Sequence, residues 1–221
     1  PLGMIPEGWT VESLGRSVDV DKGVSYKGEY LVDDGKPMVN LKCFRPEGGF
    51  SSDGLKGYSG PLKQHQLVKP GEVVVANTDL TQAGNIVGSA GIVPCVDGVE
   101  TMAFTHHVYA VRPKISAGLP SLYLYHLLLT PEYKAFARGR AIGTTVLGLA
   151  REGVLDFLYA RPPRSLMETF EGTARDLYEL TQNLLARIAL ARQTRDLLLP
   201  KLISGEIDVS DLDINVGEDA A

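Results

Sequence analysis

The sequence predicts an α+β fold, in which a globular domain with a mixed or antiparallel sheet is followed by one long helix. Two observations predict it. Up to about Pro113, short β-prone runs such as Val73–Ala76 and Val108–Val111 alternate with turn residues, as short strands do. After Pro162-Pro163, apolar residues recur every seven positions, which is typical of a helix that packs along a partner helix.

Further elements are expected between these regions of the domain. Ile92–Pro94 is expected to be another strand, because it follows a glycine-rich turn. Residues Ser121–Ala137 predict a helical stretch with a break near Thr130, since Pro131 interrupts the backbone hydrogen bonds. A short helix or strand then leads to Pro162-Pro163, which marks the domain boundary.

The long helix is predicted to begin at Ser165 and to end at Pro200. Ser165 and Glu168 fit the capping box S-x-x-E, in which two side chains bond the first free backbone N–H groups of a helix. At 1.5 Å per residue such a helix is roughly 50 Å long. Its apolar stripe, expected to be a dimerisation seam, consists of Phe170, Leu177, Leu180, Leu184, Ile188, Ala191 and Leu198.

This stripe is expected to be covered by a partner. Each buried leucine contributes about 1.5–3 kcal/mol, so leaving the stripe in water would be a serious loss. Because the chain has one such helix, the simplest partner is a second copy or a helix of another subunit. The alternative is that the helix folds back onto its own domain.

The formal net charge of −5 is unevenly distributed. Residues 1–164 carry 17 Lys and Arg against 16 Asp and Glu, whereas residues 165–221 carry 5 against 11. We therefore divide the chain into a domain at 4–164, a helix at 165–200 and an acidic tail at 201–221, with 1–3 as the remnant of a cleaved tag. Since the domain is nearly neutral, any face that binds nucleic acid must be a local patch.

Composition also predicts a cytoplasmic protein. The chain has no apolar run of the roughly 18 residues that a membrane span needs, and it shows no signal peptide. Cys43 and Cys95 suit neither a disulfide framework nor a zinc site. Both are expected to be small buried residues.

No motif predicts a catalytic residue, a metal or a cofactor on this chain. Glycine-rich nucleotide-binding loops are missing from the sequence. His106 and His107 are the one pair that could act as a base or as metal ligands. On a strand, however, adjacent side chains point to opposite faces, so strand packing is the preferred interpretation. An enzyme with an unfamiliar site stays as an alternative.

Four groups of basic and polar residues lie in loops of the domain and could face a DNA duplex. Lys and Arg would contact phosphates, whereas amide and hydroxyl side chains could bond base edges. The groups are Lys22, Ser25, Tyr26 and Lys27; Lys42 and Arg45; Asn77, Thr78, Thr81 and Gln82; and Arg138, Arg140, Thr144 and Thr145.

Several segments resemble, in their order along the chain, the specificity subunits of type I restriction–modification systems. They are the opening Ile5–Trp9, the central block Lys69–Thr81, the stretch from Gly143 to Pro163, and Arg195–Ile207 at the end of the helix. The last segment is the most specific. Together these segments extend over most of the chain.

The resemblance implies a non-catalytic subunit whose target-recognition domain binds one half-site in double-stranded DNA. It implies two further partners in the complex. A methyltransferase subunit would use S-adenosylmethionine to methylate adenine, and a motor–nuclease subunit would add cleavage. No cofactor is then expected on this chain itself.

Members of that family usually have two recognition domains and two helices packed antiparallel, whereas this sequence holds one of each. The resemblance therefore implies a half-size subunit, or half of a longer one. Such a chain would form a homodimer through an antiparallel coiled coil and would bind the same half-site on opposite strands. The alternative function is a coiled-coil adaptor that does not bind DNA.

Overall fold

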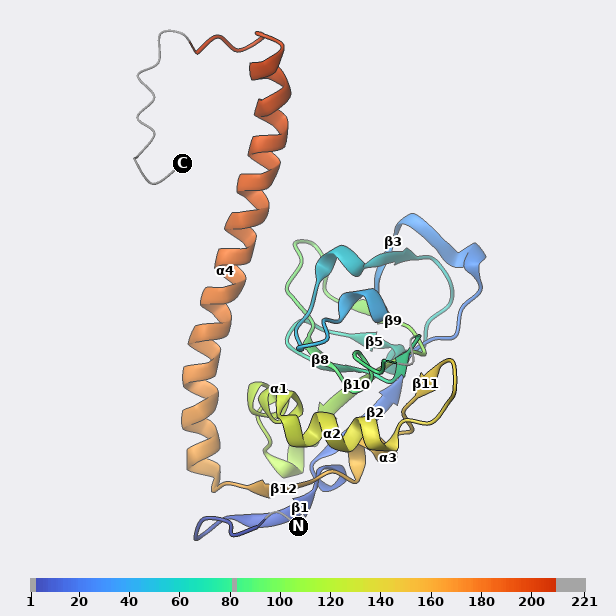
Figure 1. Cartoon of the computed structure of the whole chain (residues 1–221), viewed down its shortest axis with the longest axis vertical. Coiled ribbons are helices and arrows are strands. Elements are labelled where there is room, and N and C mark those ends of the chain that lie inside the picture. The colour runs from blue at the N-terminus through green and yellow to red at the C-terminus, as the bar shows by residue number, and fades with distance from the viewer. Residues whose placement is uncertain (1–2, 81–82, 210–221) are drawn as a thin grey trace. The chain divides into compact units, whose positions relative to one another are not determined.

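The computed structural model describes residues 3–80 and 83–209, which divide into two compact units. The first unit ends at Arg175 and holds the strands, and the second begins at Asp176 and holds the remainder of the long helix (Figure 1). None of the helices in the described ranges combines the length and apolar character that a membrane span needs.

A four-stranded antiparallel sheet forms the middle of the first unit. Its strand order is β2 (Val18–Lys22), β10 (Val108–Pro113), β6 (Val73–Ala76) and β8 (Ala90–Ile92). The strands predicted at Val73–Ala76 and Val108–Val111 are confirmed. The strand predicted at Ile92–Pro94 is misplaced, because β8 ends at Ile92 and Pro94 has no N–H with which to extend the ladder.

A second four-stranded sheet packs beside the first. Its order is β4 (Lys56–Tyr58), β3 (Leu31–Val39), β9 (Met102–Phe104) and β5 (Leu67–Val68). It is mixed, because β3 and β9 run parallel while the other pairs are antiparallel. The predicted α+β class with mixed and antiparallel strands is therefore confirmed.

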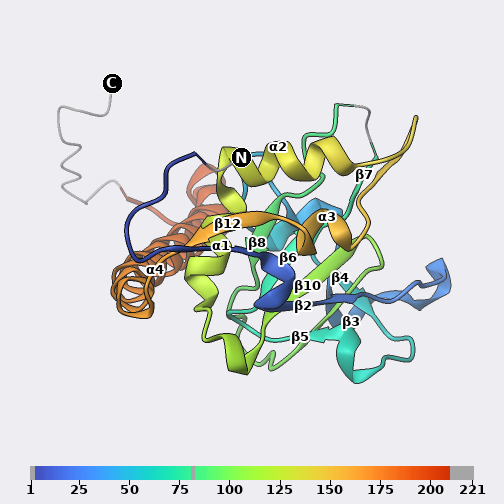
Figure 2. The same ribbon diagram turned by 90° about the horizontal axis from the view of Figure 1, so that it is seen from below.

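The two sheets enclose the main core of the domain. Val74 and Ala76 of β6 pack with Val39, Met102 and Phe104 of the second sheet. Val73 and Val75 point to the opposite face, since side chains alternate along a strand. That face is covered by helices, and Figure 2 shows them on one side of the central sheet with β3 and β5 on the other.

Three helices lie on the outer side of the central sheet, where the first contacts β6, β8 and β10 and the second packs against the first and the third. They are α1 (Ser121–Leu129), α2 (Pro131–Arg140) and α3 (Glu152–Leu155). The break predicted near Thr130 is confirmed, because Thr130 separates α1 from α2. The Thr130 hydroxyl accepts a hydrogen bond from the Tyr133 N–H at 3.3 Å, which caps α2 directly before Pro131.

Two short ribbons complete the domain, β7 (Thr78–Asp79) with β11 (Leu147–Gly148), and β1 (Thr10–Ser13) with β12 (Leu158–Arg161). The second ribbon contains a half-buried polar cluster. Oε1 of Glu12 accepts hydrogen bonds from Ser17 Oγ at 2.6 Å, Tyr159 Oη at 2.7 Å and Arg161 Nη1 at 2.8 Å. This cluster ties the start of the domain to the residues that precede the long helix.

The long helix, α4, spans Arg164–Ile203, close to the predicted 165–200. It begins one residue early, and Glu168 accepts a hydrogen bond from Arg164 Nε at 2.7 Å. It also continues past Pro200, since the missing N–H removes a single bond near the end of the helix. Gly205 ends it, with a φ of +74° that favours glycine.

The first turns of α4 pack within the domain, which is why the compact unit extends to Arg175 rather than to 164. The Phe170 ring lies edge-on to Tyr123 and His126, with centroids 5.7 and 5.4 Å apart. Phe170 was expected in the dimerisation seam, but its ring contacts α1 in the same chain.

The two cysteines differ in burial. Cys43 is buried, and its burial raises the pKa of the thiol to about 11. Cys95 is exposed, so the expectation that both are buried is wrong. Cys95 follows Pro94 in the loop beyond the end of β8, outside the core.

Candidate nucleic-acid interface

One end of the central sheet gathers the loops that carry the predicted DNA-binding residues. The strand register places Lys22 beside Tyr109, Val108 beside Ala76, and Val75 beside Ala90. At this end, which we call the loop end, β2 and β6 finish while β10 and β8 begin. The connections that leave these four strands therefore meet in space.

Two of the four predicted groups reach the loop end directly along the strands. Lys22 is the last residue of β2, and Ser25, Tyr26 and Lys27 follow it. Asn77 and its neighbours follow β6. These segments are at least 50 residues apart in the sequence, so only the sheet register brings them together.

The other two groups are joined to the loop end by hydrogen bonds. Lys134 Nζ donates to Pro46 O at 2.6 Å and to Ser89 Oγ at 2.9 Å, which holds the loop of Arg45 beside the start of β8. Arg138 Nη2 donates to Ala83 O, and β11 pairs with β7. All four predicted groups therefore surround one end of the sheet, although Thr81 and Gln82 lie outside the described residues.

Most of the predicted contact residues are exposed. Tyr26 is the half-buried one among them, because its ring packs edge-on against Tyr58 with centroids 6.1 Å apart. The Lys27 side chain is 82% exposed and forms a loose ion pair with Glu29 at 3.9 Å. The exposed residues are Lys22, Ser25, Lys27, Lys42, Arg45, Arg138, Arg140, Thr144 and Thr145.

Asn77 and Thr78 are not placed to contact DNA. They are only 4% and 7% exposed. The Asn77 amide donates from Nδ2 to His106 O at 3.0 Å, and the Thr78 hydroxyl donates to Asn77 Oδ1 at 2.7 Å. The sequence suggested base contacts because amide and hydroxyl groups suit them, but here the same groups bond within the protein and support a turn.

The basic residues of α2 are partly engaged within the chain. Arg140 Nη1 lies 3.7 Å from Asp156 Oδ2, and its guanidinium carbon lies 4.3 Å from the centre of the Phe136 ring. Arg138 donates to a loop carbonyl, as described above. We therefore expect Lys27 and Arg45 to be freer than Arg140 to follow a phosphate backbone.

His106 and His107 form the two-residue turn between β9 and β10, so their expected position on a strand is wrong. The two rings stack with centroids 3.8 Å apart and planes tilted by 40°. A polar Thr-His-His triplet between two apolar strands was a signal for this turn, but it lacks the glycine or asparagine that usually marks one. The histidine turn lies at the loop end.

The histidine turn is fixed by hydrogen bonds to Asn77 and to Thr78, the first residue of β7. His107 Nδ1 lies 3.1 Å from Thr78 Oγ1, and the Asn77 N–H donates to His107 O at 2.9 Å. Burial lowers the pKa of His107, and the nearby His106 and Lys22 lower it further. Both effects favour the neutral form of the His107 ring.

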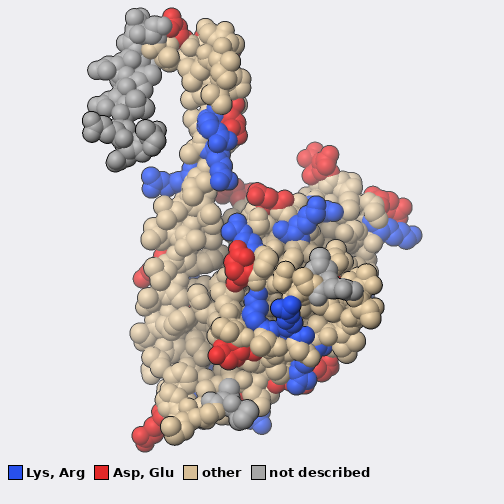
Figure 3. All heavy atoms as spheres, in the orientation of Figure 1, with Lys and Arg blue, Asp and Glu red and all other residues tan. Residues whose placement is uncertain are grey.

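Charges on the visible face of the domain are mixed. Figure 3 shows Lys and Arg interspersed with Asp and Glu, with a small group of basic side chains near the middle of the domain. This pattern agrees with the near-neutral balance of residues 1–164. Within residues 3–80 and 83–209, no three His, Cys, Asp or Glu side chains gather in a way that could hold a metal ion.

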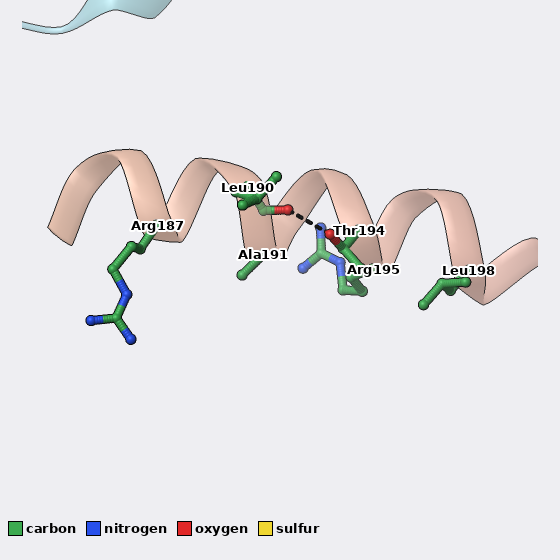
Figure 4. A pocket seen from close by; sticks show the side chains of 6 residues that line it. All are labelled: Arg187, Leu190, Ala191, Thr194, Arg195 and Leu198. Carbon is green, nitrogen blue, oxygen red and sulfur yellow. Dashed lines mark hydrogen bonds between the residues drawn. The ribbon is translucent and has the colours of Figure 1, made fainter. Parts of the chain in front are cut away.

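The remaining members of the predicted seam are exposed on α4. Leu177, Leu184 and Ile188 are 60%, 46% and 47% exposed, and Leu180, Ala191 and Leu198 are exposed as well. A shallow hollow there is lined by Arg187, Leu190, Ala191, Thr194, Arg195 and Leu198 (Figure 4). Since all six side chains come from one helix, the hollow is open helix surface rather than an enclosed cavity.

No protein-family model matches the sequence, and no curated protein matches it. Solved structures of type I restriction–modification proteins do match. The S subunit from M. genitalium shares 14% identity over 92% of this chain, with a TM-score of 0.64. The HsdS subunit from Thermoanaerobacter tengcongensis shares 17% identity over 94%, with a TM-score of 0.55.

A third match is a chain from a structure that describes complex assembly and conformational transition of the type I R-M system. It shares 19% identity over 91% of this chain, with a TM-score of 0.57. The chain spans about half the length of these solved chains, 47–48%. At such low identity, the likeness establishes a shared fold that includes the domain and the long helix.

Proposed function

We propose that this chain, which has the fold of type I S subunits, is a DNA-specificity subunit of a type I restriction–modification system. Its domain would bind one half-site of double-stranded DNA at the loop end. The observation that carries the proposal is that the S subunits share the domain and the long helix over more than nine-tenths of the chain.

The loop end supports this assignment because it brings together side chains suited to both parts of DNA recognition. Lys22, Lys27 and Arg45 would contact phosphates and set the register, whereas Ser25 and the hydroxyls of Thr144 and Thr145 would bond base edges. Each wrong base pair should cost about 1–3 kcal/mol. Because the domain is nearly neutral, few phosphates would be neutralised, and binding should depend only moderately on salt.

The chemistry would belong to partner subunits. A methyltransferase subunit would bind S-adenosylmethionine, flip the target adenine out of the duplex and methylate it, and a motor–nuclease subunit would add cleavage. The present chain would choose the site without catalysing a step. Such a complex would act in the cytoplasm, where the DNA is.

The exposed stripe of α4 supports a homodimer with antiparallel helices. Two copies related by a two-fold axis would present two identical domains. Each would bind the same half-site on opposite strands, so that the whole site would be an interrupted palindrome.

The proposal is tested by methylome sequencing of cells that express this chain with a type I methyltransferase subunit. N6-methyladenine within a symmetric interrupted motif is expected only when the chain is present. An asymmetric motif would mean that a second, different specificity chain takes part. Absence of chain-dependent methylation, with both proteins expressed, would contradict the proposal.

The loop end itself is tested by substitution. A Lys22→Ala, Lys27→Ala and Arg45→Ala triple variant should lose most of its affinity for the motif and show a shallower salt dependence. Arg16→Ala is the matched control, because Arg16 is exposed and lies before β2, at the end of that strand opposite to Lys22. Equal loss in both variants would argue against the loop end.

The exposed seam favours one alternative, a coiled-coil adaptor that joins proteins without binding DNA. The same triple variant distinguishes it. An adaptor would keep all of its partner binding when Lys22, Lys27 and Arg45 are replaced, and the wild-type chain would bind motif and random duplexes equally weakly.

A further inference from the structure

The hydrogen bonds around the histidine turn determine which nitrogen of His107 carries its proton. His106 O is a carbonyl, so the Asn77 atom 3.0 Å from it must be the donor Nδ2. Oδ1 of Asn77 therefore faces Thr78, and the Thr78 hydroxyl donates its only proton to it at 2.7 Å. The Thr78 oxygen must then accept from His107 Nδ1–H at 3.1 Å.

Neutral His107 consequently has an unprotonated Nε2. In the described part of the chain, the hydrogen bonds of the His107 side chain use Nδ1 alone. The ring is half-buried, and Nδ1 bonds inward to β7, so the lone pair on Nε2 lies on the opposite side of the ring. The turn thus presents a fixed hydrogen-bond acceptor at the loop end.

A purely structural role explains His106, the first residue of the histidine turn, poorly. Nδ1 of His106 is buried and has no hydrogen-bond partner among the residues that the structure describes, nor does the neighbouring Thr105 Oγ1. An unpaired buried polar atom destabilises a fold. An apolar side chain would fill such a position at lower cost, so packing alone does not account for histidine here.

The surroundings of Nε2 restrict what it can bind. Lys22 from β2 and the His106 ring lie close enough to lower the pKa of His107. The neutral imidazole must therefore find a donor on its ligand. On a DNA duplex, the base-edge donors are exocyclic amino groups, those of adenine and cytosine in the major groove and that of guanine in the minor groove.

We propose that His107 is a specificity-determining residue whose Nε2 accepts a hydrogen bond from the exocyclic amino group of a base in the recognised half-site. This inference rests on the proposed function. Lys22 would hold the adjacent phosphate, and Asn77 and Thr78 would act as positioning residues that fix the tautomer and the orientation of the ring.

The test combines base analogues with substitutions. The motif is first selected from a random duplex library with the wild-type chain and its methyltransferase subunit. Each base that has an amino group is then replaced by an analogue without it, namely purine for adenine, 4-deaminated pyrimidinone for cytosine and inosine for guanine. The analogue that weakens wild-type binding by about 10- to 100-fold identifies the base that is read, and hence the groove.

His107→Ala should lose a similar factor on the natural motif and should then be insensitive to that one analogue. Thr78→Val keeps the imidazole but removes the hydrogen bond that fixes which ring nitrogen is protonated. Part of the sensitivity to the analogue should therefore remain. His65→Ala is the control, because His65 is an exposed histidine in the short helical turn Gln64–Gln66. Thermal unfolding of each variant separates loss of recognition from loss of folding.

Two negative results are distinguishable. If the wild-type complex selects a motif and His107→Ala binds that motif and every analogue as the wild type does, the inference is wrong and the proposed function stands. If the wild-type complex selects no motif, the proposed function is overturned and the inference with it.

Discussion

The two units of the chain differ in how far their apolar residues are buried. In the first unit, valines such as Val74 and Val75 are fully buried between a sheet and its neighbours. In the second, Leu177, Leu184 and Ile188 are about half exposed along a helix. The same kind of periodic pattern therefore has two outcomes, a core that is completed within the domain and an apolar stripe that is exposed on the helix.

Ion pairs within the first unit differ in burial as well. In the domain, the Arg161–Glu12 pair is mostly buried, with side chains 19% and 15% exposed, and it shares its carboxylate with two hydroxyls. On the surface of α4, the Arg164–Glu168 pair has similar geometry, but its side chains are 77% and 57% exposed. Burial, rather than distance, should decide how much each pair contributes.

The largest expected effect concerns the exposed stripe of α4. Leu184→Asp with Ile188→Asp would place charges in the seam of the proposed homodimer. The loss should be about 5 kcal/mol or more, equivalent to over 1,000-fold in the dimer dissociation constant. Analytical ultracentrifugation measures it, and thermal unfolding of the domain should stay unchanged.

Ala186→Asp with Gln193→Asp is the control for this prediction. It adds the same charge on the opposite side of the helix, because those positions lie about half a turn away from the stripe. A wild-type chain that stays monomeric at high concentration would mean that a different protein, rather than a second copy, covers the stripe.

The second prediction compares the two ion pairs. Arg161→Ala should destabilise the domain by about 3–5 kcal/mol, because it leaves the Glu12 carboxylate buried without its charged partner. Arg164→Ala should change stability by less than about 1 kcal/mol. Urea denaturation measures both differences. Equal losses would show that burial does not separate the two pairs.

These contrasts show which features could be predicted from the sequence. The run Val73–Ala76 could be predicted as a strand because it is short, rich in valine and preceded by turn residues. The apolar heptads from Leu177 to Leu198 could be predicted because their period is a local property of the helix. Phe170 fits that period too. Its packing against Tyr123 and His126 depends on the position of α1, which the helical pattern does not contain.

The candidate site was predictable in its residue types but not in their arrangement. The sequence indicated four polar groups, whereas their meeting at the loop end depends on long-range register such as Lys22 beside Tyr109. Asn77 has the same chemistry whether its amide faces a base or a backbone carbonyl. The role of His107 was missed because the pair was assigned to a strand, where neighbouring rings could not stack.

The third prediction concerns the place where the domain holds the first turns of α4. Glu171 Oε2 accepts from the N–H groups of Leu122 and Tyr123 at 2.9 and 3.0 Å, where Pro120 offers α1 no side-chain cap. Glu171→Ala should cost about 1–2 kcal/mol of stability. Glu171→Gln should lose less, because its amide oxygen can still accept. Glu179→Ala, at an exposed position farther along α4, is the control.

The smallest expected effect is a pH dependence at the histidine turn. Burial, His106 and Lys22 lower the folded-state pKa of His107 below its ordinary value of 6.5. Between those two pKa values the unfolded chain binds more protons, so stability should fall as the pH decreases below about 6.5.

Glu12 affects stability in a lower pH range. Although burial raises the pKa of Glu12, the bonds from Ser17, Tyr159 and Arg161 lower it below 4.5. His107→Gln should therefore reduce the slope of the stability curve below about pH 6.5, measured by urea denaturation, and leave the acid limb unchanged. A curve that keeps its slope in this variant would mean that the turn does not hold His107 neutral.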